Sequence, residues 1–290
     1  MAKTEITPNF AIGYYLVALL IYLGYKVANT PSTGGTDQEI VSPLIGTAFV
    51  AVIIIGEYMI SVGMTKSVCG FEQWDVAAMY TFIPWVFIVG AIKGILMIRP
   101  GWLVPFSNTI GYFLASAIFG MVDVFRKILK PKVTLSNDGE EESDKSAHSR
   151  EVAKALQEIY EDESLLINQL TPDNVDGTIN KFQKVGLMYT AGEYAALPEN
   201  KDNPAAFSMF NKYIDAVKKA LWFKLFVSEF LWLFLAGVLA ISVTYNYIMN
   251  FGCKMTPDQI AEREAKLAAL SSADAANAAT QEPNTISVTQ

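Results

Sequence analysis

Ionisable side chains inside long apolar stretches are the residues of this sequence with the clearest chemical potential. Glu57 interrupts one such stretch and Lys93 another. Charges are costly in lipid, so they often mark a transport path, a proton relay or a buried partner. Glu57 and Lys93 fall at different depths along antiparallel helices, and we expect no ion pair between them. Lys93 is expected to extend toward the membrane surface beside Arg99, whereas Glu57 either accepts a hydrogen bond from another helix or is protonated. Lys224 and Glu229 are expected near an interface, with structural roles.

No constellation of residues typical of catalysis can be assembled. The single histidine, His148, lies in a charged stretch and is interpreted as a solvated linker residue. The sequence has no H-E-x-x-H, C-x-x-C or glycine-rich phosphate-binding motif. The two cysteines, Cys69 and Cys253, are too few for a disulfide framework. We therefore expect a protein that is not an enzyme and has no cofactor and no metal site.

The composition is typical of a membrane protein. The 290 residues are 52% hydrophobic and 18% charged, and the charges are concentrated between long uncharged runs. These runs are residues 6–25, 40–56, 76–92, 100–122 and 230–253. A hydrocarbon core about 30 Å thick needs roughly 20 helical residues, and buried helices of soluble proteins are rarely uncharged for so long. The pattern predicts an all-α, polytopic membrane protein with about five transmembrane helices. We place these at 9–28, 43–65, 76–98, 103–123 and 222–250.

The third and fourth predicted spans are joined by a very short link. Its residues, Arg99, Pro100, Gly101 and Trp102, predict a tight helical hairpin, with the tryptophan at the membrane interface. Small residues at four-residue spacing follow, beginning with Gly111 and Ala115. Such spacing lets helices approach closely in lipid, and we favour packing within one bundle over a dimer interface.

Basic residues predict the orientation of the chain. A cluster after the fourth span, which we expect at the membrane interface, places the central domain on the cytoplasmic side. Its members are Arg126, Lys127, Lys130 and Lys132. Five crossings then put the amino terminus inside and the carboxyl terminus outside. Cys69 and Cys253 are accordingly expected on opposite faces of the membrane, where they cannot form a disulfide. The net charge of −7 argues against specific binding of nucleic acid.

The chain divides into four parts by composition. They are a four-span bundle (1–123), an extramembrane helical domain (124–221), a fifth transmembrane helix (222–252) and a tail with a short helix and a low-complexity segment (253–290). Within the domain we expect an acidic linker at 135–147 and a helix at 149–168, followed by helix starts at Thr171-Pro172 and Asn203-Pro204. The last helix is expected to continue into the fifth span, with a length of about 45 residues.

Three strings give the sequence a family resemblance. They are RPGWLVPFSNTIGY at 99–112, EDESLLINQLTP at 161–172 and VTYNYIMNFGC at 243–253. Together they resemble a membrane-spanning minor capsid or virion membrane protein of the large icosahedral double-stranded DNA viruses, in the algal-virus and giant-virus group. Such proteins lie in the internal membrane beneath the capsid. The resemblance implies a lineage and supplies no catalytic residues.

The leading functional prediction is a structural protein that anchors a capsid shell to the internal membrane of a virion. Its expected partners are the lipid bilayer and other capsid or virion membrane proteins. The alternative is a small ion channel or transporter that uses Glu57. Pro84 and Pro105 interrupt the third and fourth spans, and broken helices often line transport sites. Against this alternative, the sequence has no internal repeat and its charges form no relay.

Overall fold

The computed structural model describes residues 8–30, 43–130, 162–184 and 186–250, together with Cys253 and isolated residues between 261 and 272. Helices dominate these residues, and the β-structure among them is one isolated antiparallel bridge between Leu129 and Met188. The predicted all-α class is therefore confirmed. The acidic linker, most of the predicted helix at 149–168, His148, Lys132 and nearly all of the tail lie outside the described residues.

Within the described residues, five helical segments are long and apolar enough to cross a membrane. The first, second and fifth are α1 (Pro8–Ala28), α3 (Pro43–Cys69) and α13 (Ala206–Asn250). The third consists of α4 (Trp74–Pro84), the π-helix η1 (Trp85–Val89) and α5 (Gly90–Ile98). The fourth consists of η2 (Pro100–Leu103), α6 (Val104–Phe106), the π-helix η3 (Ser107–Gly111) and α7 (Tyr112–Phe119). The chain is an integral membrane protein by this criterion.

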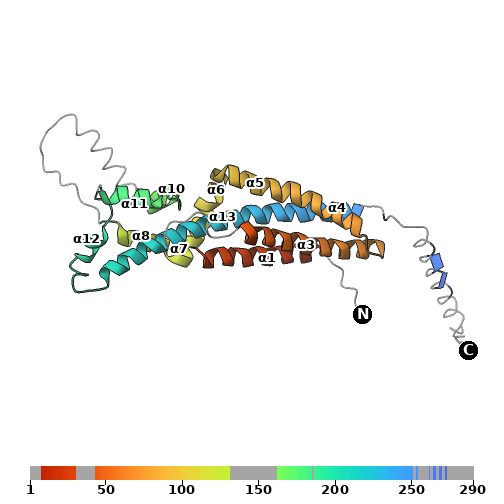
Figure 1. Cartoon of the computed structure of the whole chain (residues 1–290), viewed down its shortest axis with the longest axis horizontal. Helices are drawn as coiled ribbons and strands as arrows, with labels where there is room; N and C mark the ends of the chain where they lie inside the picture. The colour runs from red at the N-terminus through yellow and green to blue at the C-terminus, as the bar shows by residue number, and fades with distance from the viewer. Residues whose placement is uncertain are drawn as a thin grey trace, which may run out of the picture.

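The long axis of the molecule is set by α13 (Figure 1). Helices α1, α3 and α4–α5 run beside its carboxyl-terminal half and form an apolar core with it. That core includes Tyr15, Ile53, Trp85, Leu233 and Ile241. Tyr15 fits against the helix because Gly237 has no side chain: an added Cβ there would lie 2.0 Å from the tyrosine ring. Many side chains on the outer faces of these helices are apolar and exposed, as expected for contact with lipid.

Four short helices gather around the amino-terminal half of α13 and form the domain that we expect outside the membrane, called the extramembrane domain below (Figure 1). They are α8 (Met121–Ile128), α10 (Glu163–Gln169), α11 (Val175–Lys184) and α12 (Ala191–Ala195). Their core packs Phe125 and Ile167 against Phe210, Val217 and Leu221 of α13. Gly120, with φ of 58°, separates α7 from α8 by a left-handed residue that glycine adopts without strain.

The two predicted helix starts lie slightly upstream of the observed ones. Helix α11 begins at Val175, after a turn in which the backbone N–H of Asn174 donates to the Thr171 hydroxyl at 3.3 Å. Helix α13 begins at Ala206, and Asn203 accepts a hydrogen bond from the Ala205 N–H at 2.9 Å. The predicted continuity is confirmed, since α13 is one helix of 45 residues that belongs to both the domain and the bundle.

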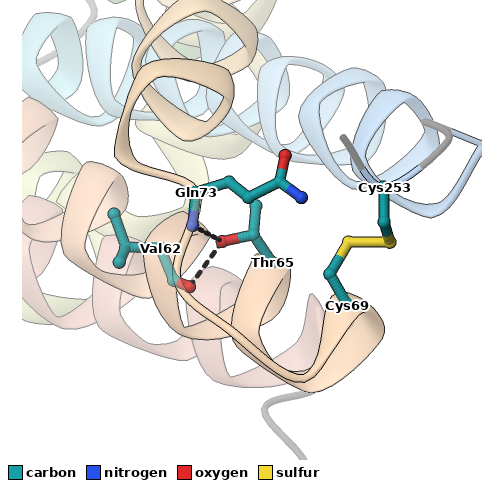
Figure 2. The surroundings of a disulfide bond; sticks show 5 residues. All are labelled: Val62, Thr65, Cys69, Gln73 and Cys253. Carbon is teal, nitrogen blue, oxygen red and sulfur yellow. Dashed lines mark hydrogen bonds between the residues drawn. A yellow bond between two sulfur atoms is a disulfide. The ribbon is translucent and has the colours of Figure 1, made fainter. Parts of the chain in front are cut away.

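The predicted separation of the two cysteines is wrong. Cys69, at the end of α3, and Cys253, just beyond α13, form a disulfide with Cα atoms 5.6 Å apart (Figure 2). The ends of α3 and α13 therefore lie at the same end of the bundle. The prediction failed because it assumed that each uncharged run reverses the direction of the chain. Between the two cysteines, α4–α5 and α13 run antiparallel, but the segment 100–119 does not run back along the bundle.

Candidate functional site

Three charged side chains from three helices meet inside the bundle. Glu229 of α13 accepts a hydrogen bond from Lys26 of α1, with 2.6 Å between Oε2 and Nζ. Its other oxygen, Oε1, forms an ion pair with Lys93 of α5. Glu229 is 8% exposed and Lys26 is buried, whereas the Lys93 side chain is 41% exposed. We call Lys26, Lys93 and Glu229 the ion-pair cluster.

The surroundings of the cluster favour the charge of Lys26. The Lys26 ammonium lies over the Phe226 ring, 4.6 Å from the ring centroid, and an aromatic face attracts a cation. Each lysine reaches Glu229 from a different helix, so the single carboxylate joins α1 and α5 to α13. In a low-dielectric region each of these charges is less costly with a partner at contact distance than without one. Its direct consequence is to fix the relative positions of three helices.

An open groove lies beside the cluster, at the junction of the bundle and the extramembrane domain. It has a volume of about 270 Å³. Its walls include Lys93, Glu229, Asp173, Trp222, Leu225 and Phe226. Within the described residues, no group of three His, Cys, Asp or Glu side chains is placed to hold a metal ion. The charged groups that line the groove are Lys93 and Glu229, which pair with each other in the cluster, and Asp173 of the domain.

Glu57 has a different environment from Glu229. It lies in α3, is 2% exposed, and its Oε1 has no hydrogen-bond partner among the described groups. The hydroxyls of Tyr14 and Tyr15 donate elsewhere, to the backbone oxygens of Val52 and Leu233, both at 2.7 Å. Lys93 pairs with Glu229 and not with Glu57, in agreement with the expected difference in depth. The prediction that Lys93 extends to the surface beside Arg99 is wrong in this respect: its ammonium turns to a buried carboxylate.

The predicted hairpin residues form a change of direction that is held by α13. Helix α5 ends at Ile98, the next residue Arg99 is non-helical with φ of −130° and ψ of 72°, and Pro100 begins the 3-10 turn. The Trp102 backbone oxygen accepts a hydrogen bond from the indole N–H of Trp232 at 2.8 Å. The two tryptophan rings also lie 5.7 Å apart, so this link is fastened to α13 through both polar and aromatic contacts.

Side chains of α13 donate hydrogen bonds to backbone carbonyls of the irregular helices. Pro84 has no N–H to donate to Tyr80, four residues earlier, and the Thr244 hydroxyl donates to the Tyr80 oxygen at 2.9 Å instead. Ser228 donates to the Leu103 oxygen at 2.6 Å. In lipid every backbone polar group needs a protein partner. The Pro84 interruption is therefore matched to a polar residue of α13, which indicates helix packing.

The basic cluster predicted at the membrane interface is engaged within the extramembrane domain. Arg126 donates two hydrogen bonds to Glu163, at 2.7 and 3.1 Å, and lowers the pKa of that carboxyl. Lys127 lies over the ring of Tyr213, 5.2 Å from its centroid. Lys130 pairs with Glu193 at 2.7 Å. Lys132, the fourth member, lies outside the described residues. The three described residues fasten α8 and the residues that follow it to other parts of the domain.

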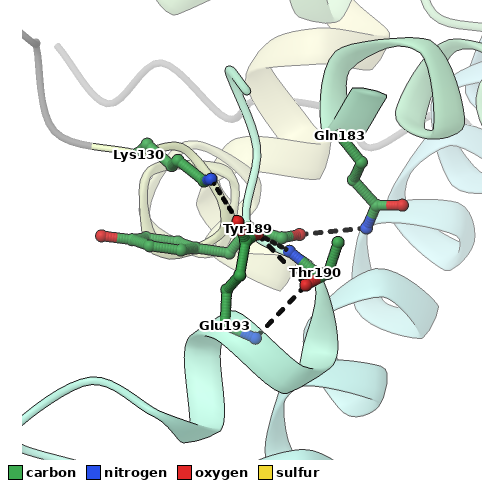
Figure 3. Close-up of polar contacts among 5 residues, drawn as sticks. All are labelled: Lys130, Gln183, Tyr189, Thr190 and Glu193. Carbon is green, nitrogen blue, oxygen red and sulfur yellow. Dashed lines mark hydrogen bonds and ion pairs between the residues drawn. The ribbon is translucent and has the colours of Figure 1, made fainter. Parts of the chain in front are cut away.

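The Lys130 contact belongs to a polar network at the start of α12 (Figure 3). Thr190 and Glu193 form a capping box in which each side chain accepts a hydrogen bond from the other's backbone N–H. Hydrogen bonds from Lys130 and from the Thr190 backbone lower the pKa of Glu193 to about 2. The Gln183 side-chain amide donates to the backbone oxygen of Tyr189 at 3.0 Å and joins α11 to the same turn.

Sequence reasoning did not identify Lys26 as a member of the site, nor the link from Glu229 to Lys93. A signal for both was present. Lys26 and Lys93 directly follow the first and third uncharged runs, and Glu229 directly precedes the fifth. For antiparallel helices these three positions coincide at one end of the bundle. The charges that end the apolar runs were therefore the best candidates for mutual pairing.

Comparisons with protein-family models, with curated proteins and with solved structures find no match for this chain. The resemblance of the three sequence strings to virion membrane proteins therefore stays a prediction. The site itself defines a membrane protein whose buried polar groups are largely used to hold its helices together.

Proposed function

We propose that this chain is a structural membrane protein that holds its extramembrane domain at a fixed position relative to the bilayer. One observation carries the proposal: α13 is a continuous helix of 45 residues that contributes to two cores. Phe210 and Val217 lie in the core of the domain, and Leu233 and Ile241 lie in the core of the bundle. A continuous helix transmits position between the two, because bending it would break backbone hydrogen bonds.

The polar groups of the bundle support the same proposal. The ion-pair cluster joins three helices, and Ser228, Trp232 and Thr244 of α13 each donate to a backbone oxygen of another segment. A carrier that alternates between states needs contacts that exchange during its cycle. Here the described contacts are direct, short and centred on one helix, which suits an anchor.

The sequence resemblance supplies the proposed setting. We place the protein in the internal membrane of a large icosahedral virion, beneath the capsid, where it ties shell components to the bilayer. Its partners in this proposal are other capsid or virion membrane proteins, which contact the extramembrane domain. Several lysines of that domain are exposed, among them Lys181, Lys201 and Lys219, and are available for cross-linking.

Sedimentation of native material combined with cross-linking mass spectrometry tests this proposal. We expect the chain to sediment with a particle of virion size and its domain lysines to cross-link to a major shell protein. Lys66 is the matched control, because it is exposed at the opposite end of the bundle and pairs with Glu72. Extraction in mild detergent as a small uniform oligomer without shell neighbours contradicts the proposal.

A second candidate function is ion or solute transport through Glu57. The observation that favours it is a carboxyl group that is 2% exposed and whose Oε1 has no hydrogen-bond partner among the described groups. Purified protein in liposomes then conducts an ion or solute, and Glu57→Gln abolishes the flux. Glu72→Gln is the control, because Glu72 is an exposed carboxylate just beyond α3. Absence of flux under every gradient tried excludes this candidate.

A further inference from the structure

The disulfide and the ion-pair cluster mark the two ends of the membrane bundle. At one end, Cys69 is bonded to Cys253, and the Tyr80 ring stacks on Tyr247. At the other end, Lys26 and Lys93 meet Glu229. Helices α1, α3, α4–α5 and the carboxyl-terminal half of α13 each extend between these ends (Figure 1). Each of the four thus crosses the bundle once.

The fourth apolar segment, Pro100–Phe119, does not extend between the two ends. Its first contacts with α13 are Trp102 with Trp232 and Leu103 with Ser228. Its last is Phe119 with Phe223, with ring centroids 5.2 Å apart. The segment is about 26 Å long from residue 102 to residue 119, whereas its contacts advance by only about 13 Å along α13. The contacted residues of α13, from Trp232 to Phe223, also lie progressively farther from the disulfide end of the bundle.

The direction of the segment in the structure agrees with these contacts. In Figure 1, α6 and α7 lie on opposite sides of α13, so the chain passes across the long helix at the level of the cluster. A segment crossing back through the membrane would instead bring Phe119 to the level of Tyr247. The disulfide independently requires an even number of crossings between Cys69 and Cys253. Helices α4–α5 and α13 supply two, and a third would place the cysteines on opposite faces.

We propose that Pro100–Phe119 is an interfacial helix at a shallow angle to the plane of the membrane, on the side of the extramembrane domain, and docks onto the lipid of that leaflet. The chain then crosses the membrane four times. The start of α1 and the disulfide share one face of the membrane, and the extramembrane domain occupies the other. This inference does not depend on the proposed anchoring role.

The two faces of the segment fit such a position. Small or short side chains at Ser107, Gly111 and Ala115 are buried against α13. An added Cβ at Gly111 would lie 2.5 Å from the Lys224 backbone oxygen, so the two backbones are in close contact. Other side chains of the segment are apolar and exposed, and Phe113 is 68% exposed. Val104, Ile110 and Ile118 are exposed as well.

Lipid is the occupant that the neighbouring residues indicate. The exposed apolar surface continues onto Met97 and Ile98 at the end of α5, which belong to the lipid-facing side of a membrane-crossing helix. Arg99 precedes the segment, and Arg126 and Lys127 follow it in α8. Apolar side chains between basic residues are typical of helices at the boundary of headgroups and acyl chains, inserted by about 5–10 Å.

Depth measurement with spin labels tests the proposal on the full chain in lipid bilayers. Single cysteines replace Val104, Ile110 and Ile118, all exposed, and Phe87 in η1 serves as the control for a crossing helix. The native cysteines are joined to each other, so the added thiol takes the label. Accessibility to oxygen and to a polar nickel reagent then gives the depth of each position.

A shallowly inclined interfacial helix keeps Val104→Cys, Ile110→Cys and Ile118→Cys within about 11 Å of depth, half of their separation along the helix axis, because the contacts with α13 advance by half the length of the segment. The Phe87→Cys label reports a greater depth than all three. A crossing helix instead spreads Val104→Cys and Ile118→Cys over about 21 Å, with Ile110→Cys near the midplane, and overturns the proposal. Labels shielded from both reagents also overturn it, because they show that protein and not lipid covers this face.

Discussion

The regions around Glu229 and Glu57 both bury a carboxyl group between membrane helices, but only Glu229 has cationic partners. Glu229 lies at one end of the bundle, where two lysines from two other helices reach it. Glu57 lies within α3, where the nearby Tyr14 and Tyr15 hydroxyls donate to backbone oxygens instead. A buried carboxyl without a cationic partner is least costly in its protonated form. One carboxylate therefore joins helices through ion pairs, and we expect the other to be a neutral group packed between helices.

The largest effect is expected for Glu229→Gln. The substitution leaves Lys26 and Lys93 without their anionic partner, and breaking a buried ion pair costs about 3–5 kcal/mol. Denaturant titration in mixed micelles, followed by tryptophan fluorescence, measures the free energy of unfolding. The triple variant Lys26→Met, Lys93→Met, Glu229→Leu is the control, since it removes every charge together and is expected near the wild type. A Glu229→Gln variant with the same free energy of unfolding as the wild type contradicts the pairing.

A smaller and unequal effect is expected when each lysine is replaced by methionine. Lys26 is buried, with its side chain 3% exposed, while that of Lys93 is 41% exposed. We expect Lys26→Met to cost about 2 kcal/mol, as for hydrogen bonds to buried charged groups. Lys93→Met is expected to cost less than about 1 kcal/mol, because a half-exposed ion pair is screened. Equal losses in the same titration contradict the assignment of Lys26 as the main partner.

Thr244→Val extends the comparison to an uncharged hydrogen-bond donor. We expect it to lower the free energy of unfolding by about 0.5–1.5 kcal/mol, typical of hydrogen bonds between membrane helices. The loss arises because Pro84 has no N–H to donate to the Tyr80 oxygen, which accepts a hydrogen bond from the Thr244 hydroxyl. Pro84→Ala restores a backbone donor, so the cost of Thr244→Val is expected to shrink in that background. A double-mutant cycle measures the difference, and an unchanged cost shows that the two sites are independent.

The existence and type of the membrane helices followed from the sequence because uncharged length is a direct physical requirement of the bilayer. The continuity of α13 followed from the spacing of Phe210, Val217 and Leu221. The partner of Lys93 did not follow, because pairing depends on which ends of the helices coincide. That in turn depends on whether residues 100–119 reverse the chain, and hydropathy alone gives a segment's affinity for lipid without its direction.

The candidate site, too, could be predicted only in part from the sequence. Glu57 and Lys93 were identified as intramembrane charges because such residues are rare in apolar runs. Lys26 was passed over as a residue at the end of a span, although it is buried. The basic cluster was assigned to the membrane interface from its position alone, while Arg126 and Lys130 pair with Glu163 and Glu193, which are distant in sequence. Contacts of this kind are set by tertiary packing.

The smallest effect is expected for Glu57→Gln, and it separates the two regions most directly. Glutamine has the shape of a protonated glutamate, so the free energy of unfolding should stay within about 0.5 kcal/mol of the wild type, the range of substitutions that disturb no contact. The same titration at the same pH permits direct comparison with Glu229→Gln, which makes the identical chemical change. A loss of similar size at both positions means that Glu57 is charged and paired, and the contrast between the two regions then fails.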